Sequence, residues 1–369
     1  MTMAPYRVGV IGCGRKGTGH ARAYALYPDT EVVAAADSDP DNLALFCDRF
    51  NLEKGYGDYR EMLEREDIDI AAPILPVVAH PEAVIACAEA GVRAIFCEKP
   101  MACSLEEADR MVEACRDIPF AAGDAYRSFP QLWDVKALID AGEIGPVRTI
   151  NLYQPTDEIS GGGCQGLCVM NLFAGDGDID WVSGWVRDDP ATDADQGMGG
   201  CVRYNSGIEA FVHCQPSARN GIEVICASGV FFSDWYTFRL WRTADGNKPT
   251  RFDQLEEDVG RFPDSGIGDR SYDADGWRVP GFRNQSGVQS IVDALDNGTP
   301  PACPGSVMRD ALEVAIAFRE SHRREHTPVH LPLKDRSLRI VPKDARMYNK
   351  KEVQGAEWYA DQIGGWTRS

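Results

Sequence analysis

Short apolar runs alternate with stretches of helical periodicity along residues 1–125 of the chain. The apolar runs predict buried strands at Arg7–Ile11, Glu31–Asp37, Ile68–Leu75, Arg93–Cys97 and Pro119–Ala125. Helical spacing predicts helices between them, at Gly17–Tyr27, Asp41–Phe50, Glu61–Glu66, Pro81–Ala90 and Ser104–Cys115. The last of these opens with the capping box Ser104-Leu105-Glu106-Glu107. Such alternation predicts an α/β domain with a doubly wound parallel sheet and helices on both faces.

The pattern changes at Tyr126, after which strands follow one another with few helices between them. One helix is predicted at Gln131–Ala141, and two more return late in the chain to cover a face of the sheet, at Val288–Asn297 and Val307–Arg324. Strands are predicted at Val147–Gln154, Trp181–Asp188, Gly221–Ser228 and Tyr236–Arg242, with a hairpin turn at Asn205-Ser206-Gly207. Consecutive strands of this kind predict an α+β domain with a mostly antiparallel open sheet.

The length of 369 residues exceeds what one hydrophobic core usually organises, so we expect two domains. The change of pattern predicts a Rossmann domain at residues 1–125 and an α+β domain at residues 126–331. The polar, irregular remainder, residues 332–369, is expected to pack on a surface or on a neighbouring subunit.

Composition and charge narrow the class of protein. The chain is 44% hydrophobic and 26% charged, and no apolar run has the length of a membrane span or of a signal-peptide core. A formal net charge of −19 disfavours nucleic acids and anionic membranes as partners. The 12 cysteines lack the spacing of a zinc site, and a large chain without an export signal predicts reduced thiols. We therefore expect a cytoplasmic protein that holds no metal ion.

A glycine-rich turn joins the first predicted strand to the first predicted helix, where Gly12, Gly14 and Gly17 follow the pattern Gly-x-Gly-x-x-Gly. The first glycine permits a tight turn, the second lets the backbone approach a diphosphate, and the third lets the helix pack on the strand. The diphosphate of a dinucleotide would lie at the helix N-terminus, beside Arg15 and Lys16.

An acidic residue follows at the spacing that dinucleotide-binding domains use. Asp37 ends the second predicted strand, about 20 residues beyond the last glycine, where a carboxylate accepts hydrogen bonds from the adenosine ribose. The stretch Asp37-Ser38-Asp39 contains no Arg or Lys to meet a 2′-phosphate, which favours NAD over NADP as the cofactor. The alternative interpretation is an ordinary glycine turn and an unrelated surface aspartate.

Further segments resemble those of a known family. They are the loop Pro76–His80, the triplet Glu98-Lys99-Pro100, the segment Tyr126–Pro130 and the connection Ala141–Val147. Together with the glycine turn and Asp37, they resemble the Gfo/Idh/MocA family of sugar and cyclitol oxidoreductases. The resemblance implies a bound NAD(H) or NADP(H) and a substrate-binding role for residues 126–331. It also implies self-association through the open sheet, as a homodimer or homotetramer.

Lys99 is the residue on which the expected chemistry depends. It follows a parallel strand at the carboxyl end, where such sheets bind ligands, and a lysine beside nicotinamide can exchange a proton with a hydroxyl. The resemblance assigns it that role or a hydrogen bond to the substrate, whereas the alternative is a surface lysine before a turn proline. The residues expected to contact the cofactor are Gly12, Gly14, Arg15, Lys16, Gly17, Asp37, Pro76, His80, Glu98 and Lys99, and those expected to contact the substrate are Tyr126, Arg127 and Asn171.

One part of the family pattern is missing. Many members carry a histidine in a helix of the second domain, but this chain has none between His80 and His213. One alignment puts Gln165 at the histidine position, and another puts Asn171 near it. Because an amide orients a hydroxyl but does not accept its proton at neutral pH, we expect Lys99 to be the principal proton carrier and Gln165 to be a hydrogen-bonding orienter.

Three activities are compatible with these residues. The expected one is an NAD-dependent dehydrogenase that acts on a secondary alcohol of a sugar, glycoside or cyclitol. The second is a glycoside-cleaving enzyme, in which transient oxidation permits elimination and NAD is regenerated in each turnover. The third is a non-catalytic NAD-binding sensor. Retention of Lys99 favours the two enzymatic activities, whereas the absence of the histidine leaves the sensor as an alternative interpretation.

Overall fold

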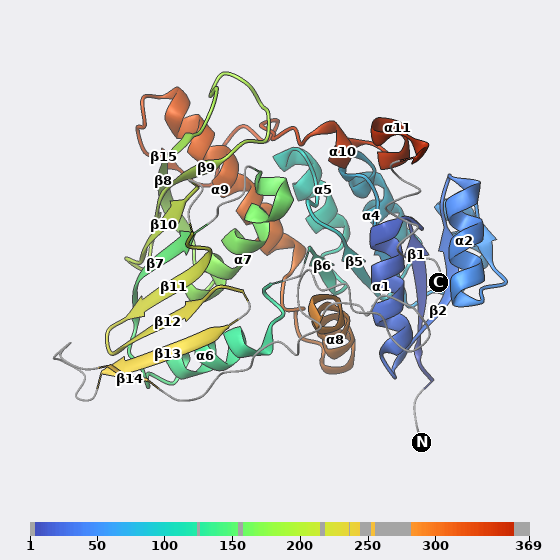
Figure 1. The fold of residues 1–369 in the computed structure, drawn as a ribbon, viewed down its shortest axis with the longest axis horizontal. Coiled ribbons are helices and arrows are strands. Elements are labelled where there is room, and N and C mark those ends of the chain that lie inside the picture. The colour runs from blue at the N-terminus through green and yellow to red at the C-terminus, as the bar shows by residue number, and fades with distance from the viewer. Residues whose placement is uncertain are drawn as a thin grey trace. The chain divides into compact units, whose positions relative to one another are not determined.

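The computed structural model describes residues 4–123, 126–153, 158–214, 218–235, 237–243, 252–254 and 282–357. These residues form two compact units, each with its own sheet (Figure 1). The first unit holds residues 4–123, 282–306 and 343–357. The second holds the described residues between 126 and 254 together with 307–342.

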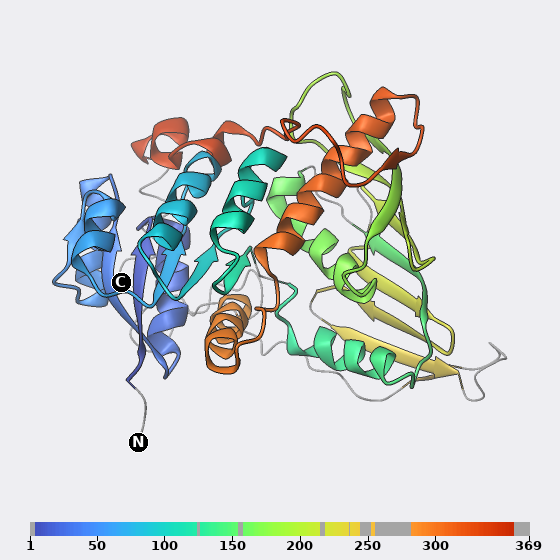
Figure 2. The same cartoon turned by 180° about the vertical axis from the view of Figure 1, so that it is seen from behind.

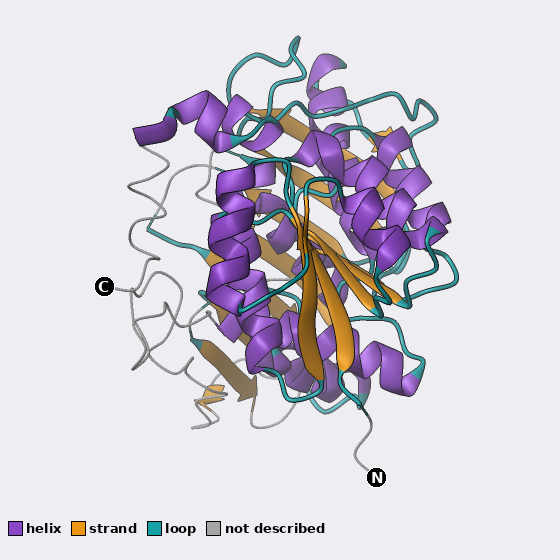
Figure 3. Ribbon diagram, turned by 90° about the vertical axis from the view of Figure 1, so that its right-hand side faces the viewer, coloured by secondary structure: helices purple, strands orange, loops and turns teal. Residues whose placement is uncertain are grey.

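A six-stranded sheet forms the centre of the first unit, in the order β3-β2-β1-β4-β5-β6, and its neighbouring pairs are parallel. Its strands are β1 (Tyr6–Ile11), β2 (Thr30–Ala36), β3 (Gly55–Tyr56), β4 (Ile70–Pro73), β5 (Ala94–Cys97) and β6 (Phe120–Ala122). Its helices are α1 (Arg15–Leu26), α2 (Pro40–Phe50), α3 (Tyr59–Arg65), the short turn η1 (Val77–Ala79), α4 (His80–Glu89), α5 (Leu105–Ala114), α8 (Phe282–Asn297), α10 (Asp344–Met347) and α11 (Lys350–Gln354). Figure 3 shows helices on both faces of this sheet, so the predicted doubly wound parallel sheet is confirmed.

Local sequence explains most of these elements. Val8, Val10 and Ile70 are fully buried, as strands covered on both faces require. The predicted capping box forms, because the Glu107 N–H donates to the Ser104 hydroxyl at 3.2 Å and the Ser104 N–H donates to the Glu107 carboxylate at 3.0 Å. The predicted end of the last strand, Ala125, lies outside the described residues.

Helix α8 corrects the domain range predicted for residues 126–331. It packs on α1 in the first unit, where Val288, Ile291 and Val292 join the core that lies against the parallel sheet. The Tyr6 hydroxyl also donates a hydrogen bond to Asp296 at 2.6 Å. The apolar stripe of an amphipathic helix can cover either sheet, so periodicity alone did not reveal which one α8 covers.

The predicted tail, residues 332–369, is divided between the units. Residues 332–342 belong to the second unit, where Val341 forms a bridge with Ala194. Residues 343–357 belong to the first unit and form α10 and α11. Residues 358–369 lie outside the described part of the chain.

A nine-stranded sheet forms the second unit, in the order β14-β13-β12-β11-β7-β10-β9-β8-β15. The strands are β7 (Val147–Tyr153), β8 (Ile179–Val186), β9 (Met198–Tyr204), β10 (Glu209–His213), β11 (Gly221–Cys226), β12 (Gly229–Ser233), β13 (Phe238–Thr243), β14 (Phe252–Gln254) and β15 (Val329–His330). The β7–β10 pair is parallel and the other pairs are antiparallel, so the predicted mostly antiparallel sheet is confirmed. The predicted hairpin joins β9 to β10, whereas the predicted strand ends Gln154 and Tyr236 lie outside the described residues.

The helices of the second unit are α6 (Pro130–Asp140), the helical turn η2 (Ile159–Gly163), α7 (Cys164–Phe173) and α9, which begins at Gly305 in the first unit and runs to Arg323. Helices α7 and α9 lie on the same side of the sheet (Figure 2). Every residue of α7 is buried, and the helix packs on β7 and β11. Across the described parts of the chain, no helix combines the length and the apolar character that crossing a membrane requires.

Candidate functional site

A cavity of about 520 Å³ lies in the first unit, at the carboxyl ends of the parallel strands. Ile11 and Ala36, the last residues of β1 and β2, contribute to its wall, as does the segment that follows β4. Among the residues predicted from the sequence, the wall includes Gly12, Gly14, Arg15, Lys16, Gly17, Asp37, Pro76, Glu98 and Lys99. The structure therefore brings these distant parts of the sequence to one cavity.

The glycine turn between β1 and α1 is shaped by close backbone contacts. Gly12 has φ 100°, and a Cβ atom there would lie 2.3 Å from the carbonyl oxygen of Ile74. A Cβ atom at Gly17 would lie 1.8 Å from the carbonyl oxygen of Gly12. Gly14 is the N-cap of α1 and brings no side chain that could cover the first turn of the helix. The helix N-terminus therefore faces the cavity, where its N–H groups and its dipole favour an anion.

Asp37 follows β2 and is held by the glycine turn. Its Oδ2 accepts the N–H of Cys13 at 2.7 Å, and its Oδ1 accepts the N–H of Asp39 at 2.8 Å. Burial raises the pKa of Asp37, although these two hydrogen bonds oppose the shift. Each carboxylate oxygen accepts more than one hydrogen bond, so both retain capacity for ribose hydroxyls.

Glu98, directly after β5, is an acidic residue of the cavity wall. Its Oε1 lies 3.4 Å from Nε2 of His20, and its Oε2 accepts the N–H of Lys99 at 2.7 Å. Burial alone would raise the pKa of Glu98, but the hydrogen bond from His20 and the charges of Lys16 and Lys99 hold it well below its ordinary value. Glu98 is therefore a carboxylate that fixes the backbone of Lys99 and balances neighbouring ammonium groups.

Lys16 lines the cavity beside this carboxylate, set into the wall but with its side chain accessible from the cavity. The charge of Glu98 raises the pKa of Lys16, but burial and the charges of Lys99, Arg15 and Lys350 together lower it below the ordinary value. Cations gathered in this way repel one another unless an anion joins them. The arrangement suits a diphosphate at the N-terminus of α1.

His80 was predicted to contact the cofactor, but the described cavity wall does not include it. It is buried at the start of α4, and its Nε2 accepts the N–H of Leu75 at 3.2 Å. Its Nδ1 lies 2.9 Å from the carbonyl oxygen of Pro100, so these partners select the tautomer protonated on Nδ1. His80 thus joins the loop after β4 to the Lys99–Pro100 segment, and its neighbour Pro76 lines the cavity.

The C-terminal segment supplies site residues that the sequence prediction missed. Arg346, Tyr348, Asn349 and Lys350 line the same cavity as the glycine turn. The sequence signal that could have found them is the run of basic residues after 342 in an otherwise acidic chain.

In the second unit, Gln165 and Asn171 are both buried on α7. The Tyr204 hydroxyl donates to Oδ1 of Asn171 at 2.6 Å, so this amide oxygen is engaged within the protein. Asn171 therefore has a structural partner that the sequence prediction did not foresee.

Arg127 was predicted to bind an oxygen-rich substrate, but its donors are directed to the protein. The side chain is 2% exposed, and Nη1 donates to the carbonyl oxygen of Cys168 and to Oδ1 of Asp176, each at 2.8 Å. Nη2 donates to Oδ2 of Asp176 at 2.5 Å. Arg127 thus clamps the segment before α6 to the C-terminal end of α7. Its neighbour Tyr126 stacks on Trp235, with ring centroids 4.6 Å apart.

The N-terminal end of the α7 segment is held by a buried carboxylate. Asp195 accepts the N–H groups of Ile159 and Ser160, each at 2.8 Å, as well as the Ser160 hydroxyl. Burial raises the pKa of Asp195, and these hydrogen bonds oppose the shift. Asp195 therefore anchors the glycine-rich turn η2, which leads directly into the helix that carries Gln165.

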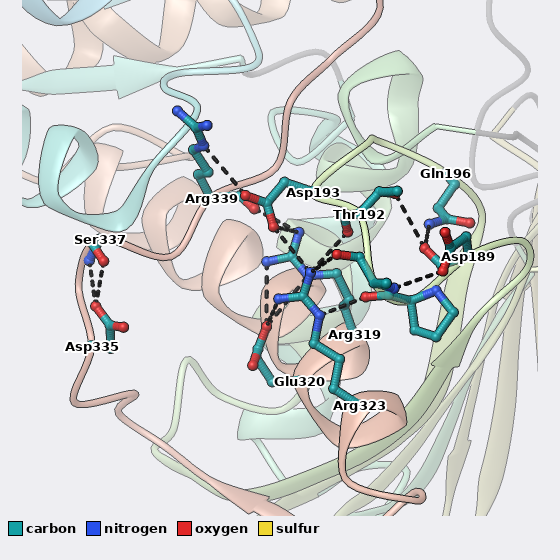
Figure 4. Close-up of polar contacts among 12 residues, drawn as sticks. Asp189, Thr192, Asp193, Gln196, Arg319, Glu320, Arg323, Asp335, Ser337 and Arg339 are labelled. Atoms are coloured by element: carbon teal, nitrogen blue, oxygen red, sulfur yellow. Dashed lines mark hydrogen bonds and ion pairs between the residues drawn. The ribbon is translucent and has the colours of Figure 1, made fainter.

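The loop that carries Asp195 is fastened to α9 by arginines (Figure 4). Arg323 donates to the carbonyl oxygens of Pro190 at 2.6 Å and of Thr192 at 3.0 Å. Arg319, which is fully buried, lies 3.2 Å from Asp193 and donates to the carbonyl oxygen of Arg339 at 2.7 Å. Both ends of α7 are therefore tied to the rest of the second unit.

The residues that the structure describes contain no candidate metal site. Within them, no group of three or more His, Cys, Asp or Glu side chains is placed to hold a metal ion. All 12 cysteines are free, and most of them are buried.

Comparison with known proteins agrees with this geometry. Residues 6–118 match the sequence model of the Gfo/Idh/MocA group, described as an oxidoreductase family with an NAD-binding Rossmann fold. This match agrees with the resemblance to the Gfo/Idh/MocA family that the sequence motifs carry. Myo-inositol 2-dehydrogenase of Thermotoga maritima is 32% identical over 148 residues, which are 40% of this chain and 44% of that protein. Levoglucosan dehydrogenase of Pseudarthrobacter phenanthrenivorans is 34% identical over 155 residues, 39% of this chain and 40% of the relative. Both alignments span less than half of the relative.

Solved structures of oxidoreductases resemble the chain over most of its length. A levoglucosan dehydrogenase in complex with NADH and L-sorbose has a TM-score of 0.73 and 21% identity, and the match covers 89% of this chain and 100% of that one. An oxidoreductase from Agrobacterium radiobacter in complex with NAD⁺, L-tartaric acid and magnesium has a TM-score of 0.71 and 21% identity, over 89% of this chain and 98% of that one. At this identity the likeness establishes the fold.

Proposed function

We propose that the protein is an NAD-dependent oxidoreductase that transfers a hydride between a secondary alcohol of a sugar, glycoside or cyclitol and nicotinamide. The observation that carries the proposal is the cavity of the first unit, whose wall combines the glycine turn, Asp37 and Lys99. The names of the matched relatives, among them myo-inositol 2-dehydrogenase and D-apiose dehydrogenase, support this class of substrate.

The residues of the cavity fit NAD. The close contacts at Gly12 and Gly17 keep the turn tight, and Gly14 leaves the first turn of α1 uncovered for a diphosphate. The carboxylate of Asp37 suits the adenosine ribose. Bound NAD would supply the hydride acceptor.

Lys99 is the residue to which we assign the proton. Oxidation of a carbinol releases a proton as well as a hydride, so a proton carrier must face the substrate. Lys99 lines the cavity, and its backbone N–H is fixed by Glu98 at 2.7 Å. We assign to Gln165 the orientation of the substrate oxygen, since an amide donates and accepts hydrogen bonds without taking the proton. Tyr126 is proposed as a further substrate contact.

The test follows NADH absorbance beside product analysis across a panel of cyclitols, sugars and glycosides. Growth of NADH supports the dehydrogenase. Cleavage of a glycoside without net NADH would instead support transient oxidation, and NAD binding with no turnover would support a sensor. Lys99→Met is expected to lower turnover about a hundredfold or more while NAD still binds. Gln165→Ala is expected to lower turnover by a smaller factor. Near-full activity of Lys99→Met on the true substrate would refute the assignment.

We also propose that the second unit associates with a second copy of the chain, in a homodimer or homotetramer. Trp185 in β8 and Phe211 in β10 are 43% and 36% exposed. Phe211 pairs with Cys201, which pairs with Ser183, so Phe211 and Trp185 share one face of the sheet. An exposed aromatic pair on a sheet face favours a protein partner. Sedimentation tests this, because Phe211→Glu should lower the mass of the assembly, and a monomeric wild-type protein at micromolar concentration would contradict it.

The free cysteines indicate the cellular compartment of the protein. Free thiols persist in a reducing compartment, so we propose a cytoplasmic location. Fractionation of the native cells checks it, and recovery from an oxidising compartment would contradict it.

A further inference from the structure

The C-terminal segment of the first unit lies over the cavity. Helix α10 packs on the turn η1, and Figures 1 and 2 show α10 and α11, in red, beyond the carboxyl ends of the parallel strands. Arg346 from α10 and Lys350 from α11 line the cavity, and so do Tyr348 and Asn349 between the two helices. Part of the wall of the cavity that the glycine turn lines is therefore built by a segment that is more than 300 positions away in the sequence.

Specific contacts hold this segment in place. Nζ of Lys351 lies 2.8 Å from Oδ2 of Asp39 and 3.2 Å from Oδ2 of Asp41. Sγ of Cys103 lies 3.6 Å from Sδ of Met347. Since Asp39 follows Asp37 by two residues, the attachment lies at the loop that we assign to the adenosine ribose.

Two adjacent lysines thus do different things. Lys350 lines the cavity, whereas Lys351 pairs with the loop after β2 and is absent from the described cavity wall. The side chain of Asn349 caps α11 by accepting the Lys351 N–H at 2.9 Å, which fixes the start of the helix that carries both lysines.

The charges around Lys350 point to an anionic ligand. Burial and the charges of Arg15, Arg346 and Lys99 lower the pKa of Lys350, against an opposing effect of Glu98. The cavity wall as described has six cationic residues and three acidic ones: Arg15, Lys16, Arg60, Lys99, Arg346 and Lys350 against Asp37, Asp58 and Glu98. A surplus of cations in a chain of net charge −19 is unfavourable without an anion and favourable with one.

We propose that residues 343–354 form a C-terminal clamp, in which Lys350 and Arg346 bind the diphosphate of the dinucleotide and Lys351 fastens the clamp to the ribose loop. The inference rests on the proposed NAD binding and adds binding residues outside the Rossmann sequence motif. The N–H groups at the start of α1 contact the diphosphate from one side, and the clamp contacts it from the other. Release of the dinucleotide then requires the clamp to detach.

Binding measurements on the full chain test the diphosphate contact. We expect Lys350→Gln and Arg346→Gln each to lower the affinity for NAD and for ADP-ribose by roughly tenfold or more. Each substitution removes a charge-assisted hydrogen bond to phosphate. Adenosine, which has no phosphate, should bind these variants as it binds the wild-type protein. The matched control is Arg116→Gln, an exposed cation of the same unit outside the described cavity wall, which should bind all three ligands normally.

Other outcomes would overturn the clamp. Unchanged NAD and ADP-ribose affinity in both variants would remove Lys350 and Arg346 from the site. An equal loss for adenosine would show that they act on the fold of the site and do not bind phosphate. If the wild-type protein binds neither NAD nor ADP-ribose, the proposed function itself fails, and the clamp fails with it.

The attachment has its own kinetic test. Lys351→Ala removes the pairs with Asp39 and Asp41 but leaves both diphosphate contacts in place. We expect NADH to leave this variant several-fold faster in stopped-flow displacement, because the C-terminal clamp loses its attachment to the ribose loop. An unchanged release rate would contradict the role of Lys351.

Discussion

Replacing Arg127 with methionine tests whether this arginine stabilises the second unit or binds the substrate. The guanidinium donates to the Cys168 carbonyl oxygen and to both oxygens of Asp176. Methionine keeps much of the apolar stem but removes these charge-assisted hydrogen bonds, each of which contributes about 1.5–3 kcal/mol in favourable cases. Since Asp176 is 41% exposed, water partly compensates its lost partner, and we expect a net loss of about 2–3 kcal/mol.

Calorimetric unfolding measures this loss. For a unit of this size, about 1 kcal/mol corresponds to roughly 2–4 °C, so the transition of the second unit should fall by roughly 4–12 °C. NAD affinity should stay the same, because Arg127 belongs to the second unit. Arg203→Met is the matched control, since it breaks a more exposed pair with Glu209 and should change stability by less than about 1 kcal/mol.

One result would refute this structural role. If Arg127→Met unfolds at the temperature of Arg203→Met but raises the KM for the substrate, then Arg127 binds the substrate as the sequence suggested. A loss of stability that Arg127→Lys partly restores would support the structural role of Arg127 in joining the segment before α6 to α7. Lysine keeps the charge but lacks the planar fork of donors.

Three further predictions concern the dinucleotide cavity. Gly17→Ala should abolish NAD binding or folding of the first unit, since a Cβ atom there would lie 1.8 Å from the Gly12 carbonyl oxygen; calorimetric titration beside circular dichroism checks it. Asp37→Ala should lower the affinity for NAD by roughly tenfold and the affinity for NADP by a smaller factor. An unchanged affinity for NAD would contradict the ribose contact. NAD affinity should fall as the pH rises from about 7 to 10, because Lys16 and Lys350 have lowered pKa values, lose their protons earlier than ordinary lysines and then no longer attract the diphosphate; a pH-independent NADH fluorescence titration would contradict this.

The parts of the site that could be predicted from the sequence are those encoded over short distances. The glycine turn is recognisable because the close approaches at Gly12 and Gly17 exclude any side chain, and these residues are five positions apart. Asp37 is recognisable because β2 must end at the same edge of the sheet as β1. The capping box at Ser104 is equally local. The causes at Gly17 and Ser104 are local, whereas the close approach at Gly12 also involves Ile74 and the place of Asp37 depends on the pairing of β1 with β2.

The parts that could not be predicted depend on partners far along the chain. A buried arginine and a substrate-binding arginine look alike in sequence, and only the structure pairs Arg127 with Asp176, 49 positions away. The contact between Lys351 and Asp39 joins positions 312 apart. His80 was predicted to contact the cofactor, but the direction of its ring depends on the Leu75 N–H and the Pro100 carbonyl oxygen, which no spacing rule specifies.

The charge of the whole chain explains why such a cavity would need the C-terminal segment. A net charge of −19 repels an anionic dinucleotide at long range, but salt screens that repulsion over about 8 Å at physiological ionic strength. Inside the cavity the nearest charges therefore dominate, and two of its six cationic residues, Arg346 and Lys350, come from the C-terminal segment. Without these two, the remaining four cations would face three carboxylates and leave a small surplus for a diphosphate. The C-terminal segment thus accounts for two of the net surplus of three positive charges that the six cations and three carboxylates of the cavity wall leave for an anion.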